Sequence, residues 1–195
     1  MNAYDFDGTI FDGDSTAGFF AYCRKRSLKI RLLTPLYLSG YALLALGIWD
    51  KTRAKEHFYA FLRRVPDIKA WVADFWDKNV NRIKPWYYEK QRPDDMILSA
   101  SPRFLLGDVC SRLGIKRLIC SEVDGKTGKY EGKNCHGEEK VRRLREEYGG
   151  EAIEEFYSDS YNDAPLARIS GKAFCVKKND IYPWDECFRD KGKRS

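Results

Sequence analysis

The sequence predicts an α/β fold in which a parallel sheet carries an inserted helical module. Short apolar segments alternate with helical patterns after residue 90, and residues 15–90 are nearly all helical in pattern. A cluster of acidic residues, YDFDGTIFD, follows the first short segment almost at the start of the chain. The 195 residues suffice to bury one core together with such a module.

The sheet is expected to contain five short strands. Asn2, Ala3 and Tyr4 supply the first, although it is short and only partly apolar. Four apolar segments supply the others, at residues 96–98, 118–120, 156–157 and 173–176. Helical spacing separates them at residues 104–113, 138–148 and 164–169. Alternation of this kind is typical of parallel strands joined by helical crossovers.

Two further segments carry local signals. The turn-rich stretch DGKTGKYEG, residues 124–132, predicts a small hairpin before a helix that begins near Gly137. The polar C-terminal stretch, residues 188–195, is expected to fray.

Composition restricts the class of protein. The chain is 43% hydrophobic and 33% charged, as in a globular protein, and its net charge of +6 suits an anionic partner. It contains no isolated Lys/Arg tract and no zinc-finger or RNP signature, so nucleic acid is not expected as a partner. The six cysteines form no CxxC pair and sit mostly among apolar neighbours, which predicts reduced, buried thiols. Without a secretory signal, the cytoplasm is the expected location.

One stretch of the helical module carries no charge. It begins at Leu32 and ends at Trp49, and its length is close to that of a transmembrane helix. One interpretation is a buried helix of the module. The other is insertion into one face of an anionic membrane, because basic residues flank the stretch on both sides. These are Arg24, Lys25, Arg26, Lys29 and Arg31 before it, and Lys51, Arg53 and Lys55 after it.

The acidic opening suggests a phosphate and metal site. Asp5 and Asp7 would lie at the carboxyl end of the first strand, where α/β sheets bind ligands. Gly8 permits a tight turn whose exposed N–H groups can hold an anion. Carboxylates beside such a turn make sense if Mg²⁺ bridges them to a phosphate.

A second acidic pair supports this interpretation. In FYSDSYNDAP, Asp159 follows an apolar strand, and Asp163 lies four residues later beside Asn162. Alone, this stretch would suggest only the capped start of a helix. Both Asp159 and Asp163 would lie at the carboxyl end of that strand, so one metal could be shared with the first pair.

Two more residues complete the pattern. Ser99 ends the apolar strand of ILSASP, where its hydroxyl and the following amide at Ala100 can bind a phosphoryl oxygen. Lys140 in CHGEEKV can bring a compact positive charge to the same place. Lys133 is a rival for this role, but Lys140 is preferred because it follows Gly137 inside a helical pattern.

The motifs DFDGT, LSAS, GEEK and SDSYND resemble, in this order, the four motifs of the haloacid dehalogenase (HAD) phosphatases. The match is closest to the phosphoserine phosphatase-like branch. The resemblance covers nearly the whole chain and implies a Rossmann-like core with strand order 5-4-1-2-3. Residues 1–14 and 91–195 would form this core, and residues 15–90 would form a helical cap of the C1 type.

The resemblance also implies Mg²⁺-dependent phosphoryl transfer through an aspartyl-phosphate. Asp5 resembles the nucleophile and a metal ligand, and Asp7 resembles the general acid–base. Ser99 and Lys140 resemble the pair that binds phosphate. Asp159 resembles a metal ligand, with Asp163 and Asn162 in supporting positions, so that Asp5, Asp7 and Asp159 are expected to hold the Mg²⁺.

The substrate is less constrained than the reaction. Asp14 could hold an amine, but the cap offers no clear arginine for a carboxylate, which makes phosphoserine a poor candidate. A small soluble phosphomonoester is therefore expected. The alternative is a lipid phosphate, since the uncharged stretch and YSDSYNDAPL resemble HAD-type phosphatidylglycerophosphate phosphatases. A non-catalytic partner-binding or membrane-associated module is a third interpretation, which a complete catalytic set argues against.

Overall fold

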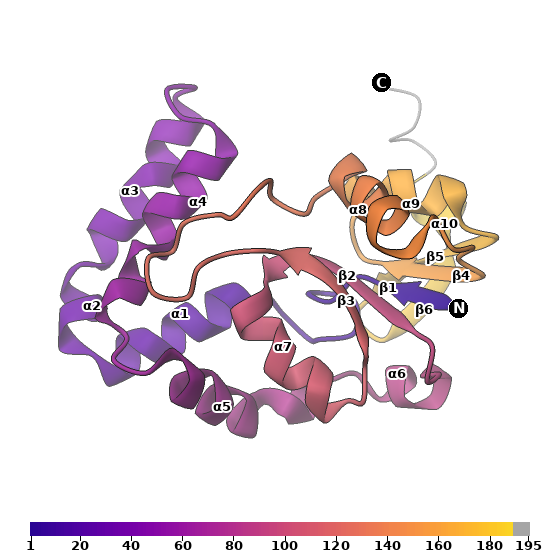
Figure 1. Cartoon of the computed structure of the whole chain (residues 1–195), viewed down its shortest axis with the longest axis horizontal. Helices are drawn as coiled ribbons and strands as arrows, with labels where there is room; N and C mark the ends of the chain where they lie inside the picture. Colours follow the sequence, from indigo (N-terminus) through magenta and orange to yellow (C-terminus); the bar gives the residue numbers. More distant parts are fainter. Residues whose placement is uncertain (189–195) are drawn as a thin grey trace.

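A computed structural model describes residues 1–188 and shows a six-stranded sheet with helices on both faces (Figure 1). The strand order is β3-β2-β1-β4-β5-β6, and the first five strands in the chain pair in parallel. This confirms the predicted order 5-4-1-2-3. The strands are β1 (Asn2–Tyr4), β2 (Met96–Pro102), β3 (Arg117–Ser121), β4 (Glu155–Ser158), β5 (Lys172–Lys177) and β6 (Asp180–Pro183). The last strand, an antiparallel edge beside β5, was not predicted.

The short strand β1 lies in the middle of the sheet. It pairs with β2 on one side and β4 on the other, so that three residues form two ladders. All three are buried, and the Asp5 N–H extends the ladder by donating to the Tyr157 carbonyl at 2.9 Å. Pairing on both edges therefore compensates for the poor strand propensity of the sequence.

Alternate residues of the strands enter two separate cores. Tyr4, Ile97 and Tyr157 point to one face of the sheet, where they pack with α6 (Pro85–Lys90) and α7 (Arg103–Arg112). Ala3 and Phe156 point to the other face, against α8 (Glu138–Tyr148) and α9 (Ala164–Ile169). The two-residue period of a strand thus produces a three-layer arrangement.

Residues 15–90 contain helices, as predicted. They are α1 (Ser15–Arg26), α2 (Leu28–Leu32), α3 (Thr34–Ala45), α4 (Lys51–Tyr59), α5 (Ile68–Asn79) and α6, with short 3-10 turns at Ala60–Arg64 and Val80–Arg82. Side chains of Asp14, Ser27, Asp50 and Asp67 accept main-chain N–H bonds and begin α1, α2, α4 and α5. Helix α3 begins instead with Pro35 in its first turn.

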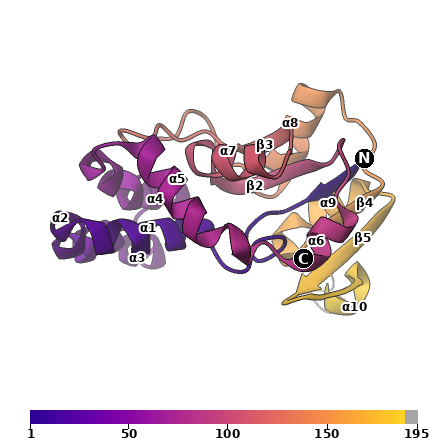
Figure 2. The same ribbon diagram turned by 90° about the horizontal axis from the view of Figure 1, so that it is seen from below.

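Helices α1 to α4 lie at one end of the molecule, away from the sheet, whereas α6 lies close to it (Figure 2). The Tyr87 ring of α6 packs edge-on against Tyr4 of β1, with 5.1 Å between centroids. Trp76 of α5 donates its indole N–H to the Leu105 carbonyl of α7 at 2.8 Å. The division into a core of 1–14 and 91–195 and a cap of 15–90 stays a prediction.

The expectation that the uncharged stretch is a buried helix is wrong. Only residues 34–45 of it form helix α3, and Leu32, Leu46 and Ile48 are 70%, 72% and 63% exposed. Gly40 lets α3 pack closely on α4, because a Cβ there would lie 3.2 Å from the Ala54 carbonyl oxygen. A helix packed on one neighbour buries one face and leaves the other exposed. Among residues 1–188, no helix has the length and apolar character needed to cross a membrane.

The cysteine prediction needs one correction. Cys23, Cys110, Cys120 and Cys135 are free and buried as expected, but Cys175 and Cys187 form a disulfide. Helix α10 (Trp184–Phe188) folds back beside β5 and brings the two residues within 6.3 Å between Cα atoms. The sequence did not indicate the pairing, because it depends on the unpredicted strand β6.

The stretch at 124–132 turns back on itself as a small hairpin, as predicted, although its arms are too short to form strands. The Asp124 N–H donates to the Lys129 carbonyl and the Glu131 N–H to the Glu122 carbonyl, each at 2.9 Å. Asp124 accepts N–H bonds from Lys126 and Thr127, and a single antiparallel bridge joins Val123 to Tyr130. Of the C-terminal stretch expected to fray, residues 189–195 lie outside the described residues.

Candidate active site

Predicted site residues from three strands meet at the carboxyl edge of the sheet. Asp5 follows β1, Ser99 lies in β2 and Asp159 follows β4, and these three strands are neighbours. A cavity of about 250 Å³ opens there. Eight predicted residues line it: Asp5, Asp7, Asp14, Ser99, Ala100, Lys140, Asn162 and Asp163. Gly8 and Asp159 lie beside one another next to the same turn.

Asp5 and Lys140 form the buried centre of this site. The Lys140 ammonium lies 2.9 Å from Asp5 Oδ1 and 2.8 Å from Asp163 Oδ1, and its side chain is 2% exposed. Burial raises the pKa of Asp5, and the positive charge of Lys140 opposes that rise. The two carboxylates hold the pKa of Lys140 above its usual value despite its burial, so the ammonium stays charged.

Asp7 occupies a different environment from Asp5. Its Oδ1 accepts the main-chain N–H of Ser15 at 2.7 Å, and its Oδ2 accepts the Ser101 hydroxyl. Burial raises the pKa of Asp7 to about 6, although both hydrogen bonds lower it. A carboxyl group with such a pKa can hold a proton near neutral pH and release it again.

Asp159 lies close against the main chain of the turn that follows Asp7. Gly8 has a φ of 74°, and a Cβ at this position would lie 2.1 Å from Asp159 Oδ2. Thr9 Oγ1 accepts the Asp159 N–H at 2.9 Å, and the ammonium of Lys84 donates to the Gly8 carbonyl at 2.5 Å. Only glycine both adopts this conformation and leaves room for the carboxylate.

The predicted trio of metal-binding carboxylates is not assembled as such. Within residues 1–188, no three Asp, Glu, His or Cys side chains are grouped to hold a metal ion. The Asp7 carboxylate faces Ser15 and Ser101, because it is held by their hydrogen bonds. The Asp159 carboxylate still lies against Gly8 in the turn that follows Asp5, close enough to Asp5 for the two carboxylates to interact electrostatically. This donor set fits Mg²⁺, which uses one or two carboxylates with other oxygens.

The predicted phosphate-binding residues lie around Asp5. Ser99 is buried, and its Oγ accepts the Ser101 N–H at 3.2 Å. Lys140 reaches the cavity, whereas its rival Lys133 is not among the residues that line it. Asp163 Oδ2 accepts the Ser158 hydroxyl at 2.8 Å, so that its other oxygen is fixed on Lys140.

Helices α1, α3 and α4 contribute residues that the sequence analysis missed. They are Thr16, Tyr41, Lys55 and Tyr59. Lys55 donates to Asn134 Oδ1 at 3.2 Å, and burial lowers the pKa of its ammonium to about 8. Asp14 faces the same cavity, and one of its oxygens caps α1 through the Ala17 N–H. No motif marked Lys55, since its position depends on how α4 packs. Ser101 lies only two residues after Ser99, in the same motif, and could have been considered.

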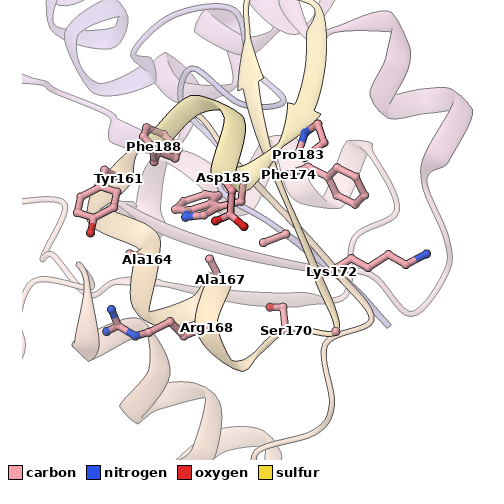
Figure 3. Close-up of a pocket in the computed structure, with 13 residues that line it drawn as sticks. Tyr161, Ala164, Ala167, Arg168, Ser170, Lys172, Phe174, Pro183, Asp185 and Phe188 are labelled. Carbon is pink, nitrogen blue, oxygen red and sulfur yellow. The ribbon is translucent and has the colours of Figure 1, made fainter. Parts of the chain in front are cut away.

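A larger cavity of about 970 Å³ lies elsewhere, among α9, β5, β6 and α10 (Figure 3). The rings of Tyr161 and Phe188 form part of its wall, 5.6 Å apart between centroids. None of the predicted site residues lines it. Its size therefore does not make it the catalytic site, since the grouped carboxylates and lysine are in the smaller cavity.

Comparison with known proteins identifies the family. Residues 3–168 match the family model of the haloacid dehalogenase-like hydrolases. This chain is a haloacid dehalogenase-like hydrolase. The predicted family is confirmed, and with it the prediction that the protein is an enzyme of the HAD phosphatase type.

A curated relative and two solved structures are similar to this HAD protein. A histidinol-phosphatase of Neisseria meningitidis serogroup C is 32% identical in an alignment 204 positions long, which covers 89% of this chain and 88% of that protein. A Bordetella pertussis Tohama I protein of unknown function shares the fold with a TM-score of 0.75, at 19% identity, over 98% and 95% of the two chains. A probable phosphoserine phosphatase from Vibrio cholerae has a TM-score of 0.62 at 15% identity, covering 88% of this chain and 55% of its own.

Proposed function

We propose that this HAD protein hydrolyses a phosphate monoester in the presence of Mg²⁺ through an aspartyl-phosphate on Asp5. The observation that carries the proposal is the buried contact of Lys140 with Asp5 and Asp163 beside Asp7 and Ser99. A lysine fixed on the reacting carboxylate offsets the repulsion between that carboxylate and a phosphate dianion. Family membership supports the same reaction.

The first half of the reaction uses both aspartates of the opening motif. An Asp5 carboxylate oxygen attacks phosphorus, and the bond from phosphorus to the leaving oxygen breaks. Asp7 donates its proton to that oxygen, which fits a pKa raised to about 6 by burial. The hydroxyl of Ser99 and the ammonium of Lys140 hold the phosphoryl oxygens meanwhile.

The second half regenerates the enzyme. The Asp7 carboxylate accepts a proton from water, whose oxygen attacks the phosphorus of the aspartyl-phosphate. The bond to Asp5 breaks, and inorganic phosphate leaves. The carboxylates of Asp5 and Asp159 would hold Mg²⁺, which would supply positive charge against the phosphoryl group when bound.

The cavity favours a small phosphorylated metabolite. Its volume of about 250 Å³ and its charged lining suit a polar leaving group that meets Asp14 and Lys55. Histidinol phosphate heads the substrate panel because of the histidinol-phosphatase relative. Phosphoserine joins it, because Lys55 supplies a cap cation that could meet a carboxylate.

A lipid phosphate is the second candidate, and one observation favours it. A groove lined by Phe20, Leu38 and Phe58 shares Asp14 and Tyr41 with the catalytic cavity. An apolar portion of a larger substrate could lie there. Phosphatidylglycerophosphate therefore completes the panel.

The test is p-nitrophenyl phosphate hydrolysis with Mg²⁺ and with excess chelator. Asp5→Asn should lower kcat on the order of a thousandfold or more, since no nucleophile replaces the carboxylate. Asp12→Asn is the matched control, because Asp12 is exposed, does not line the cavity and should leave kcat unchanged. Wild-type activity that survives in Asp5→Asn would refute the mechanism, and activity unaffected by chelation would refute the role of Mg²⁺.

A further inference from the structure

Exposed apolar side chains are concentrated on one part of the molecule. Ten large apolar side chains are strongly exposed among residues 1–188, and seven of them lie between residues 28 and 48. The seven are Leu28, Leu32, Leu36, Leu38, Tyr41, Leu46 and Ile48. We call this group the apolar surface. Such a concentration marks an interaction site, whereas single exposed leucines do not.

The shape of this region lets the apolar surface reach a partner. Helices α3 and α4 form a projecting hairpin at the end of the molecule opposite the sheet (Figure 1). The tip between them carries Leu46 and Ile48, 72% and 63% exposed. No charged residue lies between Leu32 and Trp49, so the tip could enter an apolar medium without burying a charge.

Basic side chains surround the apolar surface. Residues 15–55 contain eight Lys or Arg and a single acidic residue, Asp50, which gives a net charge of +7. Lys29 and Arg31 lie between Leu28 and Leu32 in sequence, and both are exposed. Arg53 lies over the Trp49 ring at 4.7 Å, next to the tip. Trp and basic residues beside an apolar tip are typical of segments at a membrane–water interface.

We propose that residues 28–53 dock on an anionic lipid surface, with Leu46 and Ile48 inserted among the acyl chains and the basic residues on the headgroups. A second copy of the chain fits this surface less well, because two such surfaces would bring like charges together. A short insertion of this kind needs no membrane-spanning helix. The docking does not depend on the proposed substrate.

The docked orientation would bring the catalytic cavity near the membrane. Tyr41 belongs to the apolar surface and also lines the cavity that contains Asp5. Leu38, on the same helix, lines the adjoining groove. The mouth of the site and the docking surface are therefore continuous on α3.

The experiment is flotation of the full chain with vesicles, either of pure phosphatidylcholine or of phosphatidylcholine mixed with phosphatidylglycerol. The wild type should float with the mixed vesicles at low salt and be released by high salt. The double variants Leu46→Asp/Ile48→Asp and Lys29→Glu/Arg31→Glu should each weaken binding by about tenfold or more.

Matched variants control for charge and for folding. Ile169→Asp alters an exposed isoleucine of α9, and Lys69→Glu/Lys116→Glu makes the same charge change at two exposed lysines elsewhere. Both should float like the wild type. Hydrolysis of p-nitrophenyl phosphate measures folding of every variant and tests the proposed function separately, since none of these residues lines the catalytic cavity.

Three results would overturn the proposal. The first is failure of the wild type to bind the mixed vesicles at low salt. The second is binding of Leu46→Asp/Ile48→Asp as strong as that of the wild type. Light scattering could instead show a dimer that Leu46→Asp/Ile48→Asp dissociates, which would assign the surface to a second copy of the chain.

Discussion

At the scale of single residues, the site separates two carboxylates by environment. The Asp5 carboxylate contacts the buried ammonium of Lys140. The Asp7 carboxylate accepts hydrogen bonds from the Ser101 hydroxyl and the Ser15 main-chain N–H. Burial raises the pKa of both carboxyl groups. At Asp5 the charge of Lys140 opposes that rise, and at Asp7 the hydrogen bonds from Ser101 and Ser15 oppose it. The same residue type, two positions apart, is thus suited to two roles.

Lys55 leads to a prediction about pH. Burial lowers the pKa of Lys55 from 10.5 to about 8, so its ammonium is charged below pH 8 and becomes neutral above it. If Lys55 attracts the anionic substrate, KM should rise as the pH passes through about 8. Lys55→Arg keeps its charge and should remove this rise, whereas Lys51→Arg should retain it. Steady-state KM between pH 6.5 and 9.5 is the measurement, and identical profiles for wild type and Lys55→Arg would exclude the role.

At the scale of elements, caps and turns explain why helices occupy residues 15–90. An Asp or Ser begins four of these helices by accepting a main-chain N–H, and these residue types are visible in the sequence. Helix content was therefore predictable. The short strand β6 was not, because its residues pair only with β5 at the sheet edge and carry no apolar run.

The cap of α5 can be tested directly. Asp67 accepts the Ala70 N–H at 3.0 Å, and Asp67→Ala removes this bond without disturbing a buried side chain. The free energy of unfolding should fall by about 1 kcal/mol. Lys69→Ala, two residues later and exposed, should change it by less than about 0.5 kcal/mol. Urea unfolding followed by far-UV circular dichroism gives both values, and equal stabilities of the two variants would contradict the role of the cap.

At the scale of the whole molecule, one apolar core joins the helices of residues 15–90 to the sheet. The same cluster contains Phe20 of α1, Trp76 of α5 and Tyr157 of β4. Trp76 is completely buried and packs between Phe6, Phe11 and Phe75. This continuity predicts that the helices and the sheet unfold together.

Replacement of Trp76 tests this coupling. Trp76→Ala should lower the free energy of unfolding by about 3–5 kcal/mol, through the cavity and the unpaired Leu105 carbonyl. Unfolding of the wild type should occur in one transition by calorimetry. Trp71→Ala is the control, since Trp71 is only partly buried and should cost less. Two separate transitions in the wild type would show that the helices and the sheet are independent units.

The sequence by itself determined the order of the elements, the strand order through family resemblance, and the residues at the strand ends. These are local properties, because apolar periodicity and motif spacing depend only on residues close to one another in the sequence. Only the tertiary structure placed Lys55 on the catalytic cavity, turned Asp7 toward Ser101 and exposed one face of α3. It also placed Cys187 beside Cys175, where the two form a disulfide. Each of these depends on packing between distant segments, which decides where a side chain points and how much of it water reaches.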